Sequence, residues 1–308
     1  MKTPEVTVVV PIYNGSAYLA ETLKSLLSQT FENFELLAID DGSTDASADI
    51  VRSLNDDRVR LIQKANGGLC HALNLGITEA RSPYIARSDQ DDISLPSRLA
   101  MQLQVMKDHP EVLAIFAYAT KIGGKHTWSN ADKYVVSHGQ CKAYEPMNDG
   151  CLLGSTMFAQ TAALRSVGGF RQAYYPADDW DLECRLAETG RVLVLQETLI
   201  AYRFQTSANT YRVFAEMREK SRWTKDSHRR RLQSIPELTI EQFRLAQPRD
   251  YWSRFRRYRR DASKLRMRNA GQRFLDGHYI AGAAHMFAAV LLNPEDMLGR
   301  LRRYLFRN

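Results

Sequence analysis

The first part of the chain alternates between short continuous hydrophobic runs and segments with helical spacing. Apolar, β-branched runs predict buried strands at Val6–Val10, Glu35–Ile39, Val59–Ile62 and Tyr84–Arg87. Apolar residues at helical spacing predict helices over Tyr18–Ser28, from a cap at Ser43 or Thr44 to about Leu54, and over Leu69–Ala80. Pro11 is expected to stop the first strand. This regular alternation predicts an α/β fold with a doubly wound, mostly parallel sheet.

The pattern continues less regularly after the fourth strand. A helix is predicted over Pro96–His109, with Ser94 as its cap, and we interpret Gly123–Asn148 as a polar loop that covers the site. Further strands are predicted at Leu113–Lys121, Gly154–Phe158, Val192–Leu195 and Leu199–Phe204. Further helices are predicted over Thr161–Val167, closed by Gly168 and Gly169, and over Asp178–Thr189, ended by Gly190.

Beyond Tyr211 the pattern becomes helical and basic. Residues 1–211 carry 19 Lys and Arg against 25 Asp and Glu, a net charge of −6, whereas residues 212–308 carry 23 against 10, a net charge of +13. This asymmetry predicts two domains, 1–211 and 212–308, with different partners. A helix is predicted over Tyr251–Leu275, and a helix pair around Pro294 ends the chain.

The last helix of that pair is predicted to be amphipathic. Its apolar side chains share one face at helical spacing: Met297, Leu298, Leu301, Tyr304 and Leu305. Arginines line the opposite side, which suits the surface of a membrane with anionic lipid. A solvated helical face, an anionic acceptor site and a dimerisation hairpin remain alternatives for the basic region. The longest apolar stretch, Ala281–Leu292, is shorter than the roughly 20 residues that a membrane span needs.

Composition narrows the class of protein further. The 308 residues are 44% hydrophobic, which suits one large domain with an appendage. The four cysteines form no C-x-x-C pair and have no metal-ligand spacing, as expected for reduced residues of a cytoplasmic protein. The N-terminus enters a strand at once, without the apolar region of a signal peptide.

Acidic residues follow two of the predicted strands at the point where each ends. Asp40 and Asp41 follow the second strand, and Asp89, Asp91 and Asp92 follow the fourth. Ligands of open α/β sheets bind at the carboxyl ends of strands, and hard oxygen ligands suit Mg²⁺ or Mn²⁺. The alternatives are a solvated acidic loop for the second group, and an Asx turn with helix capping for the first.

Five segments, in this order, carry a resemblance to a known family: VVVPIYNG, FELLAIDDGSTD, NGGLCHALNLGI, YIARSDQDDISLP and GGF…DDWDLECRL. Each lies at a predicted loop or strand end. Together they resemble the inverting glycosyltransferases of family 2, which have the GT-A fold. The resemblance covers Val6–Gln205, about two thirds of the chain.

The resemblance implies a donor site for a nucleoside diphosphate sugar. Three residues at the end of the first strand would lie against its base and ribose: Pro11, Ile12 and Tyr13. Asp41 would accept a hydrogen bond from the base, which favours a UDP-sugar. Asp89 would contact the ribose or metal-bound water, and Asp91 would ligate the Mn²⁺ or Mg²⁺ that bridges the phosphates. Asp92 would support the loop or the start of the helix.

The resemblance also implies an acceptor side. Asp179 is the expected general base, which takes the proton from the attacking hydroxyl. Asp178 stands where the family more often has Glu, and Trp180 would form a wall under the acceptor. Gly169 and Phe170 would shape the same side. Helix capping for the acids, a place in the core for Trp180 and plain turn formation for the glycines are the structural alternatives.

We therefore expect an inverting, metal-dependent, non-processive glycosyltransferase that acts on a surface glycan or a lipid-linked saccharide. It would lie in the cytoplasm, peripherally on the cytoplasmic face of the inner membrane. One departure is Gln205, where many relatives carry His. The alternative from another class is a catalytically inactive sugar-nucleotide or glycan binder. A nucleic-acid-binding protein is not expected because the basic tail has no reading motif. A nucleotidyltransferase ranks low because the loop after the first strand has no Lys or Arg.

Overall fold

The computed structural model describes residues 3–122, 137–203, 211–248, 250–275 and 277–294. Its contacts divide the chain into two compact units, residues 1–121 with 126–203 and residues 122–125 with 204–308. We call them the sheet unit and the helical unit and describe each by itself. The predicted division of function between 1–211 and 212–308 stays a prediction.

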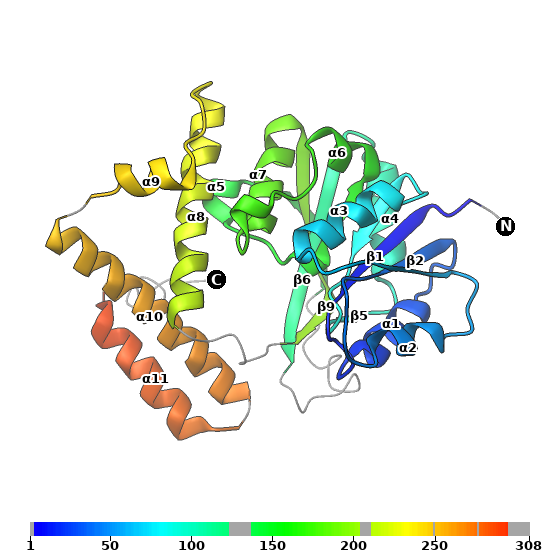
Figure 1. The fold of residues 1–308 in the computed structure, drawn as a ribbon, viewed down its shortest axis with the longest axis horizontal. Helices are drawn as coiled ribbons and strands as arrows, with labels where there is room; N and C mark the ends of the chain where they lie inside the picture. Colours follow the sequence, from blue (N-terminus) through cyan, green and yellow to red (C-terminus); the bar gives the residue numbers. More distant parts are fainter. Residues whose placement is uncertain (1–2, 123–136, 204–210, 249, 276, 295–308) are drawn as a thin grey trace. The chain divides into compact units, whose positions relative to one another are not determined.

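Within the described residues, the sheet unit contains one nine-stranded sheet (Figure 1). Its path is β3 (Val59–Gln63), β2 (Phe34–Asp40), β1 (Val6–Ile12), β4 (Tyr84–Arg87), β8 (Phe158–Gln160), β6 (Val112–Ile122), β9 (Arg191–Arg203) and β5 (Ile93–Ser94), and β7 (Ser137–Ala143) pairs with β9. β3, β2, β1 and β4 are mutually parallel. β8 joins β4 antiparallel, and β5 and β7 join β9 antiparallel. The predicted fold class, a mostly parallel doubly wound sheet, is confirmed.

Helices cover both faces of the sheet because side chains of a buried strand alternate in direction. Val8 and Val10 of β1 pack with α1 (Leu19–Leu27), α2 (Ser47–Arg52) and α4 (Arg98–Asp108). Val9 points to the other face and packs with α3 (Leu69–Glu79), α6 (Thr161–Ser166) and α7 (Asp178–Thr189). The near-continuous apolar runs in the sequence are the signature of this double coverage.

The strand order places a topological switch point between β1 and β4. From β1 the chain moves outward to β2 and β3, and then returns to β4 on the other side. Pro11 does not stop β1 as predicted, because the strand continues to Ile12. The Ile12 carbonyl accepts a hydrogen bond from the Asp41 N–H, so the backbone groups of Ile12 face β2. Successive residues of a strand direct their backbone groups to opposite sides. The nitrogen of Pro11, which has no hydrogen to donate, therefore faces β4. The β1–β4 pairing ends at Val9, so Pro11 leaves no ladder bond unmade and the two strands diverge beyond it.

Two predicted helix caps are wrong. α2 begins at Ser47 with Ala46 as its N-cap and no side-chain cap. Ser43 instead accepts a hydrogen bond from the Asn14 N–H at 3.0 Å, and Thr44 donates its N–H to Asn14 Oδ1 at 2.8 Å. These side chains tie the loop after β2 to the loop after β1, and that long-range pairing outweighs local capping.

Ser94 is likewise not the cap of α4. It lies in β5, opposite Ile200 of β9, and α4 begins at Arg98 with Ser97 as its N-cap. The Ser94 hydroxyl accepts from Arg98 Nη1 at 2.9 Å. The strand pairing of β5 takes precedence over the local Ser-Leu-Pro signal for the start of a helix.

Three further predictions need correction. Gly123–Asn148 is not simply a loop, because it contains β7 and α5 (Pro146–Asp149), while residues 123–136 lie outside the described ranges. Gly154–Thr156 forms a 3₁₀ turn, and β8 begins at Phe158. The two predicted closing strands are one continuous strand, β9, because Gln196 to Thr198 keep the extended backbone between them. Gly168 and Gly169, with φ of +78° and +64°, close α6 as predicted.

Within its described residues the helical unit contains α8 (Tyr211–Leu232), α9 (Ile240–Ala246), α10 (Tyr251–Leu275) and α11 (Tyr279–Leu292). The predicted helix Tyr251–Leu275 is confirmed. The predicted amphipathic helix around Met297–Leu305 and the departure at Gln205 both lie outside the described residues. No helix in the described ranges combines the length and apolar composition needed to cross a bilayer.

Candidate active site

A cavity of about 430 Å³ lies at the carboxyl ends of the parallel strands, where β1 and β4 diverge. It is lined by Pro11, Ile12, Tyr13, Asp41, Asn66, Gly68, Leu69, Ala72, Asp89, Gln90, Asp91, Gln172 and Tyr175. All the residues predicted to hold the donor or the metal are in this lining. The switch point of an open α/β sheet is where such folds bind ligands. The sequence motifs and the topology therefore indicate the same place.

Tyr13 and Asp41 form one side of the cavity. Tyr13 is half exposed and offers an aromatic ring to a ligand. Asp41 is buried, and its carboxylate accepts from the N–H groups of Gly67 and Gly68 at 2.9 and 2.7 Å and from the Lys64 ammonium. Burial alone would raise the pKa of Asp41, but these hydrogen bonds lower it overall. Asp41 thus holds the glycine turn against the cavity as an ionised carboxylate.

Gln90, between the two acids of the D-x-D, is a residue that sequence reasoning missed. Its side chain accepts from the Tyr13 N–H at 2.9 Å and donates to the Tyr13 carbonyl at 3.1 Å. It thereby links the loop after β4 to the loop after β1 across the switch point. A Cβ on Gly15 would lie 2.4 Å from Gln90 Oε1, so the clamp also requires glycine at that position.

Arg87, the last residue of β4, is the second residue missed. Its side chain is 3% exposed, and its Nε donates to Asp89 Oδ1 at 2.9 Å. Its Nη1 forms an ion pair with Asp179, which is 92 residues away in the sequence. Burial lowers the pKa of Arg87, but the charges of Asp179 and Asp89 more than offset this and raise it overall. One buried guanidinium therefore connects the D-x-D to the predicted base.

Gly154 lets this ion pair form. A Cβ added at Gly154 would lie 2.5 Å from Arg87 Nη1 and 2.6 Å from Asp179 Oδ2. Real Cβ atoms do not approach other atoms that closely, so the ion-paired side chains of Arg87 and Asp179 occupy the place where the side chain of any other residue at this position would begin. The sequence signal for this role is only a glycine between two short elements, which is too common to be informative alone.

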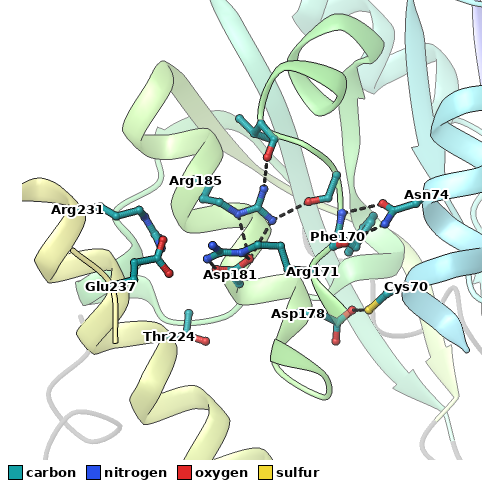
Figure 2. Close-up of polar contacts among 12 residues, drawn as sticks. Cys70, Asn74, Phe170, Arg171, Asp178, Asp181, Arg185, Thr224, Arg231 and Glu237 are labelled. Atoms are coloured by element: carbon teal, nitrogen blue, oxygen red, sulfur yellow. Dashed lines mark hydrogen bonds and ion pairs between the residues drawn. The ribbon is translucent and has the colours of Figure 1, made fainter. Parts of the chain in front are cut away.

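Asp178 and Asp179 occupy the first turn of α7 but do not cap it. The N-cap is Ala177, and no side-chain cap hydrogen bond is formed there. Asp179 is 27% exposed, whereas Asp178 is buried, with Cys70 Sγ 3.3 Å from its Oδ2 (Figure 2). Burial and the neighbouring charge of Asp179 raise the pKa of Asp178 to about 6. The adjacent acids thus have different environments, and Asp179 is the more accessible one.

Two polar contacts position the Gly168–Phe170 segment (Figure 2). Asn74 of α3 accepts from the Phe170 N–H at 2.7 Å and donates to its carbonyl at 2.8 Å. Arg185 donates to the Gly169 carbonyl at 2.7 Å and pairs with Asp181, which is fully buried. The motif is therefore rigidly held between α3 and α7.

Phe170 and Trp180 are both buried. Phe170 lies under the Arg87 guanidinium, at 5.6 Å from ring centroid to carbon. Burial of Trp180 agrees with its structural alternative, a place in the core. The acceptor-side roles assigned to Gly169, Phe170, Asp178 and Trp180 stay predictions, as does the catalytic role of Asp179, which lies outside the cavity lining.

Comparison with known proteins places the chain in a family. The family described as Glycosyl transferase family 2 matches residues 7–168. The chain is 32% identical over 224 residues to the putative glycosyltransferase EpsE of Bacillus subtilis. The matched region covers 68% of this chain and 77% of EpsE. The chain belongs to glycosyltransferase family 2. The predicted family and the predicted enzyme class are confirmed.

One of the relatives is much longer than this chain. The chain is 25% identical over 215 residues to an uncharacterized glycosyltransferase of Rickettsia felis. The matched region covers 68% of this chain but only 36% of that protein.

Among solved structures, residues 1–349 of S. aureus TarS in complex with UDP match with a TM-score of 0.56 at 18% identity, over 96% of this chain and 92% of that one. The mannosyltransferase PcManGT from Pyrobaculum calidifontis, in complex with GDP-Man and Mn²⁺, matches with a TM-score of 0.57 at 17% identity, over 95% and 88%. These similarities confirm the GT-A fold.

The acids of the glycosyltransferase site fit a divalent metal of the kind predicted. Within the described residues, no cluster of three or more His, Cys, Asp or Glu is arranged to hold a metal ion by itself. Mg²⁺-type sites, however, commonly use one or two carboxylates together with substrate phosphates. Burial raises the pKa of Asp92 well above its usual range, and the negative charges of Asp89 and Asp91 raise it further. Asp89, which is held by Arg87, and Asp91 both line the cavity.

Proposed function

We propose that this protein catalyses inverting, metal-dependent and non-processive transfer of one sugar from a nucleoside diphosphate sugar, a UDP-sugar in particular. The acceptor would be a hydroxyl of a surface glycan or of a lipid-linked saccharide. The observation that carries the proposal is the cavity at the switch point, lined by Tyr13, Asp41 and Asp91 and connected through Arg87 to Asp179. The UDP complex of TarS and the GDP-Man and Mn²⁺ complex of PcManGT support this class of donor.

In this proposal the donor lies in the cavity with its base near Tyr13 and Asp41 and its diphosphate near Asp91. Asp91 would hold Mn²⁺ or Mg²⁺, with Asp89 next to it. The bound metal would offset the negative charge that develops on the departing diphosphate. Arg87 keeps Asp89 in one orientation through its 2.9 Å contact, so the metal side of the site is preorganised.

Asp179 would act as the general base. It accepts the proton of the acceptor hydroxyl while the acceptor oxygen bonds to the anomeric carbon and the bond from that carbon to the diphosphate breaks. A single displacement of this kind inverts the configuration, so an α-linked donor gives a β-linked product. Arg87 positions Asp179 relative to Asp89, and Gly154 leaves room for this contact.

Three further parts of the proposal concern location and partners. The protein would act in the cytoplasm, peripherally at the inner membrane, in the synthesis of cell-envelope polysaccharide. The basic helical unit would contact anionic lipid, bind the acceptor or form a homodimer. The alternative function is a catalytically inactive binder on the same scaffold. The accessible Asp179 held by the buried Arg87 favours the enzyme, because a binder does not need a general base.

The test is turnover with a panel of UDP-, GDP- and dTDP-sugars in the presence of Mn²⁺. Nucleotide release should depend on one nucleotide and on the metal, and NMR of the product of an α-linked donor should show the β-anomer. Metal-dependent binding without release on any acceptor would support the inactive binder. An α-linked product would contradict the inverting mechanism.

A further inference from the structure

Helix α11 has an apolar face that no other part of the described chain covers. It contains no charged residue over its 14 residues, yet only Gly282 and Ala289 are buried. A helix that is apolar on all sides is normally enclosed in a core or in a membrane. Three large side chains that lie along one side of the helix over about three turns are instead exposed, Ile280 at 90%, Phe287 at 66% and Leu291 at 64%. We call these three residues the outer α11 face.

Contacts with α10 fix which side of α11 points outward. The two helices pack side by side (Figure 1). The Ser263 hydroxyl donates to the Ala289 carbonyl at 2.8 Å, and Arg259 Nε donates to the Leu292 carbonyl at 2.9 Å. The pairing runs antiparallel, because the later residue of α10 meets the earlier residue of α11. The outer α11 face lies on the side opposite Ala289 and is therefore unable to pack on α10.

The partner helix of this hairpin is strongly basic. α10 contains nine Lys or Arg residues and one acid, a net charge of +8. The single acid, Asp261, is buried and paired with two arginines of α8. Arg256 and Arg260 are exposed, and with Arg259 they line a hollow of about 360 Å³ at the carboxyl end of α11. This arginine hollow adjoins the end of the helix that carries the outer α11 face.

The combination of an apolar face and an arginine hollow identifies the partner by its chemistry. We propose that the α10–α11 hairpin docks the enzyme on a bilayer that contains anionic lipid. The outer α11 face would enter the boundary between headgroups and acyl chains, and the arginine hollow would take a phosphate headgroup. A helix of 14 residues is about 21 Å long and too short to span a bilayer, so it would lie in the plane of the interface.

Two observations favour a bilayer over a second copy of the chain. A second hairpin would bring another net charge of +8 toward the first, which opposes self-association. In addition, Tyr251 and Trp252 at the start of α10 are 70% and 65% exposed. Tyrosine and tryptophan are the residues enriched at membrane–water interfaces. The docking does not depend on the proposed transfer reaction, since every residue involved belongs to the helical unit.

The first test is co-sedimentation of the full chain with vesicles. The vesicles contain phosphatidylcholine in about twofold excess over phosphatidylglycerol, and pure phosphatidylcholine is the neutral reference. The double variant Phe287→Asp/Leu291→Asp should bind the anionic vesicles about tenfold or more weakly than the wild type. Leu245→Asp on α9 is the matched control, because Leu245 is 65% exposed and Leu291 64%. The control should bind like the wild type.

The second test separates charge from apolar contact. Arg256→Gln/Arg260→Gln should lower the affinity for anionic vesicles by about 30-fold, because each basic residue near an anionic surface contributes about 1 kcal/mol and two are removed. Arg52→Gln/Arg191→Gln removes the same charge from two arginines of the sheet unit that are each 53% exposed, and it should have no such effect. All variants should bind UDP as the wild type does, which shows that the sheet unit is intact.

Three results would overturn the proposal. The first is equal vesicle binding by the wild type and the Phe287→Asp/Leu291→Asp variant. The second is a wild-type dimer, measured by light scattering, that this variant converts to monomer, since a second copy would then cover the face. The third is vesicle binding only by a chain that ends at residue 294, because the chain's own last residues would then be the cover.

Discussion

Selected arginines of the two units have opposite roles. In the sheet unit the guanidinium groups of Arg87, Arg98 and Arg203 are almost completely buried, and each bonds to carboxylates or carbonyls from distant parts of the chain. In α10 of the helical unit, Arg256 and Arg260 are exposed. A buried guanidinium fixes the geometry of its partners, because leaving any of them unpaired is costly. An exposed one contributes mainly a field at the surface.

The difference teaches that net charge alone does not locate function in this protein. The sheet unit is acidic in sequence, yet its site is organised around one arginine, Arg87. The helical unit is basic in sequence, and on α10 this charge remains available to an external anion. The predictions below test this contrast, and they start with the largest expected effect.

Replacing the proposed base should almost abolish catalysis. Asp179→Asn should lower turnover by about 10³-fold, within the range that general acid–base groups contribute. The affinity for UDP should stay near that of the wild type, because Asp179 is outside the cavity lining. Turnover is measured by UDP release and affinity by calorimetry. Asp149→Asn, at another partly exposed aspartate in an ion pair, is the control. Normal turnover of Asp179→Asn would remove Asp179 from its role.

Replacing the proposed metal ligand should remove the dependence on metal. Asp91→Ala should weaken Mn²⁺-dependent UDP binding by about 10- to 100-fold, because the diphosphate would then meet the acids without a bridging cation. Calorimetry with and without Mn²⁺ measures the effect. Asp57→Ala, at an exposed aspartate of the same unit, should leave it unchanged. If UDP binding by Asp91→Ala depended on Mn²⁺ as strongly as in the wild type, Asp91 would not be the metal ligand.

Replacing the connecting arginine should affect turnover more than binding. Arg87→Lys keeps the charge but cannot contact Asp89 and Asp179 together, and we expect turnover to fall about 10- to 100-fold. Arg58→Lys is the control, because Arg58 pairs with Asp56 at 2.7 Å away from the cavity lining. An equal loss in UDP affinity and in turnover would instead indicate a merely structural role for Arg87.

The smallest effect concerns stability and pH. Burial raises the pKa of Glu183 to about 8, although the Leu152 N–H and the Tyr144 hydroxyl at 2.7 Å oppose the rise. Between about pH 4.5 and about pH 8, the Glu183 carboxyl holds a proton in the folded state that it has lost in the unfolded state. The free energy of unfolding of the wild type therefore falls as the pH rises from about 4.5 to about 8.

Glu183→Gln should lack this dependence. Each unit of pKa elevation corresponds to about 1.4 kcal/mol, so the variant should gain at least about 1 kcal/mol on the wild type between about pH 5 and pH 8. Urea unfolding at the two pH values measures it, with Glu79→Gln at a partly exposed carboxylate as the control. If the free energy of unfolding changed with pH by the same amount in Glu183→Gln and in the wild type, the raised pKa of Glu183 would be contradicted.

Sequence alone predicted the fold, and also that Tyr13, Asp41 and Asp91 gather at one cavity, because both depend on local patterns. Buried parallel strands produce continuous apolar runs, and strand order brings their carboxyl ends together, so Tyr13, Asp41 and Asp91 were predictable as neighbours. The cap at Ser43 was wrong because its hydroxyl contacts the loop after β1, and the cap at Ser94 was wrong because this residue pairs with β9 as part of β5. Local capping preferences do not contain that information.

The residues that contact Asp179, the proposed base, were not predictable in the same way. Arg87 ends an apolar strand, and a charge at such a position is the one available signal that it is buried and paired. Its partner Asp179 lies 92 residues later, and the close approach of Gly154 to both depends on the packing of β8 beside β4. Contacts between segments so far apart follow from the assembled sheet, and no single motif contains them.

The most direct test of the account is calorimetric titration of the wild-type protein with UDP, with and without Mn²⁺, and with GDP and dTDP as comparisons. We predict tight binding of UDP that requires the metal, because the cavity combines the proposed base-binding side at Tyr13 and Asp41 with an acidic corner at Asp89 and Asp91. The absence of binding for all three nucleotides, or binding unchanged by Mn²⁺, would contradict the claim that this cavity is a metal-dependent donor site.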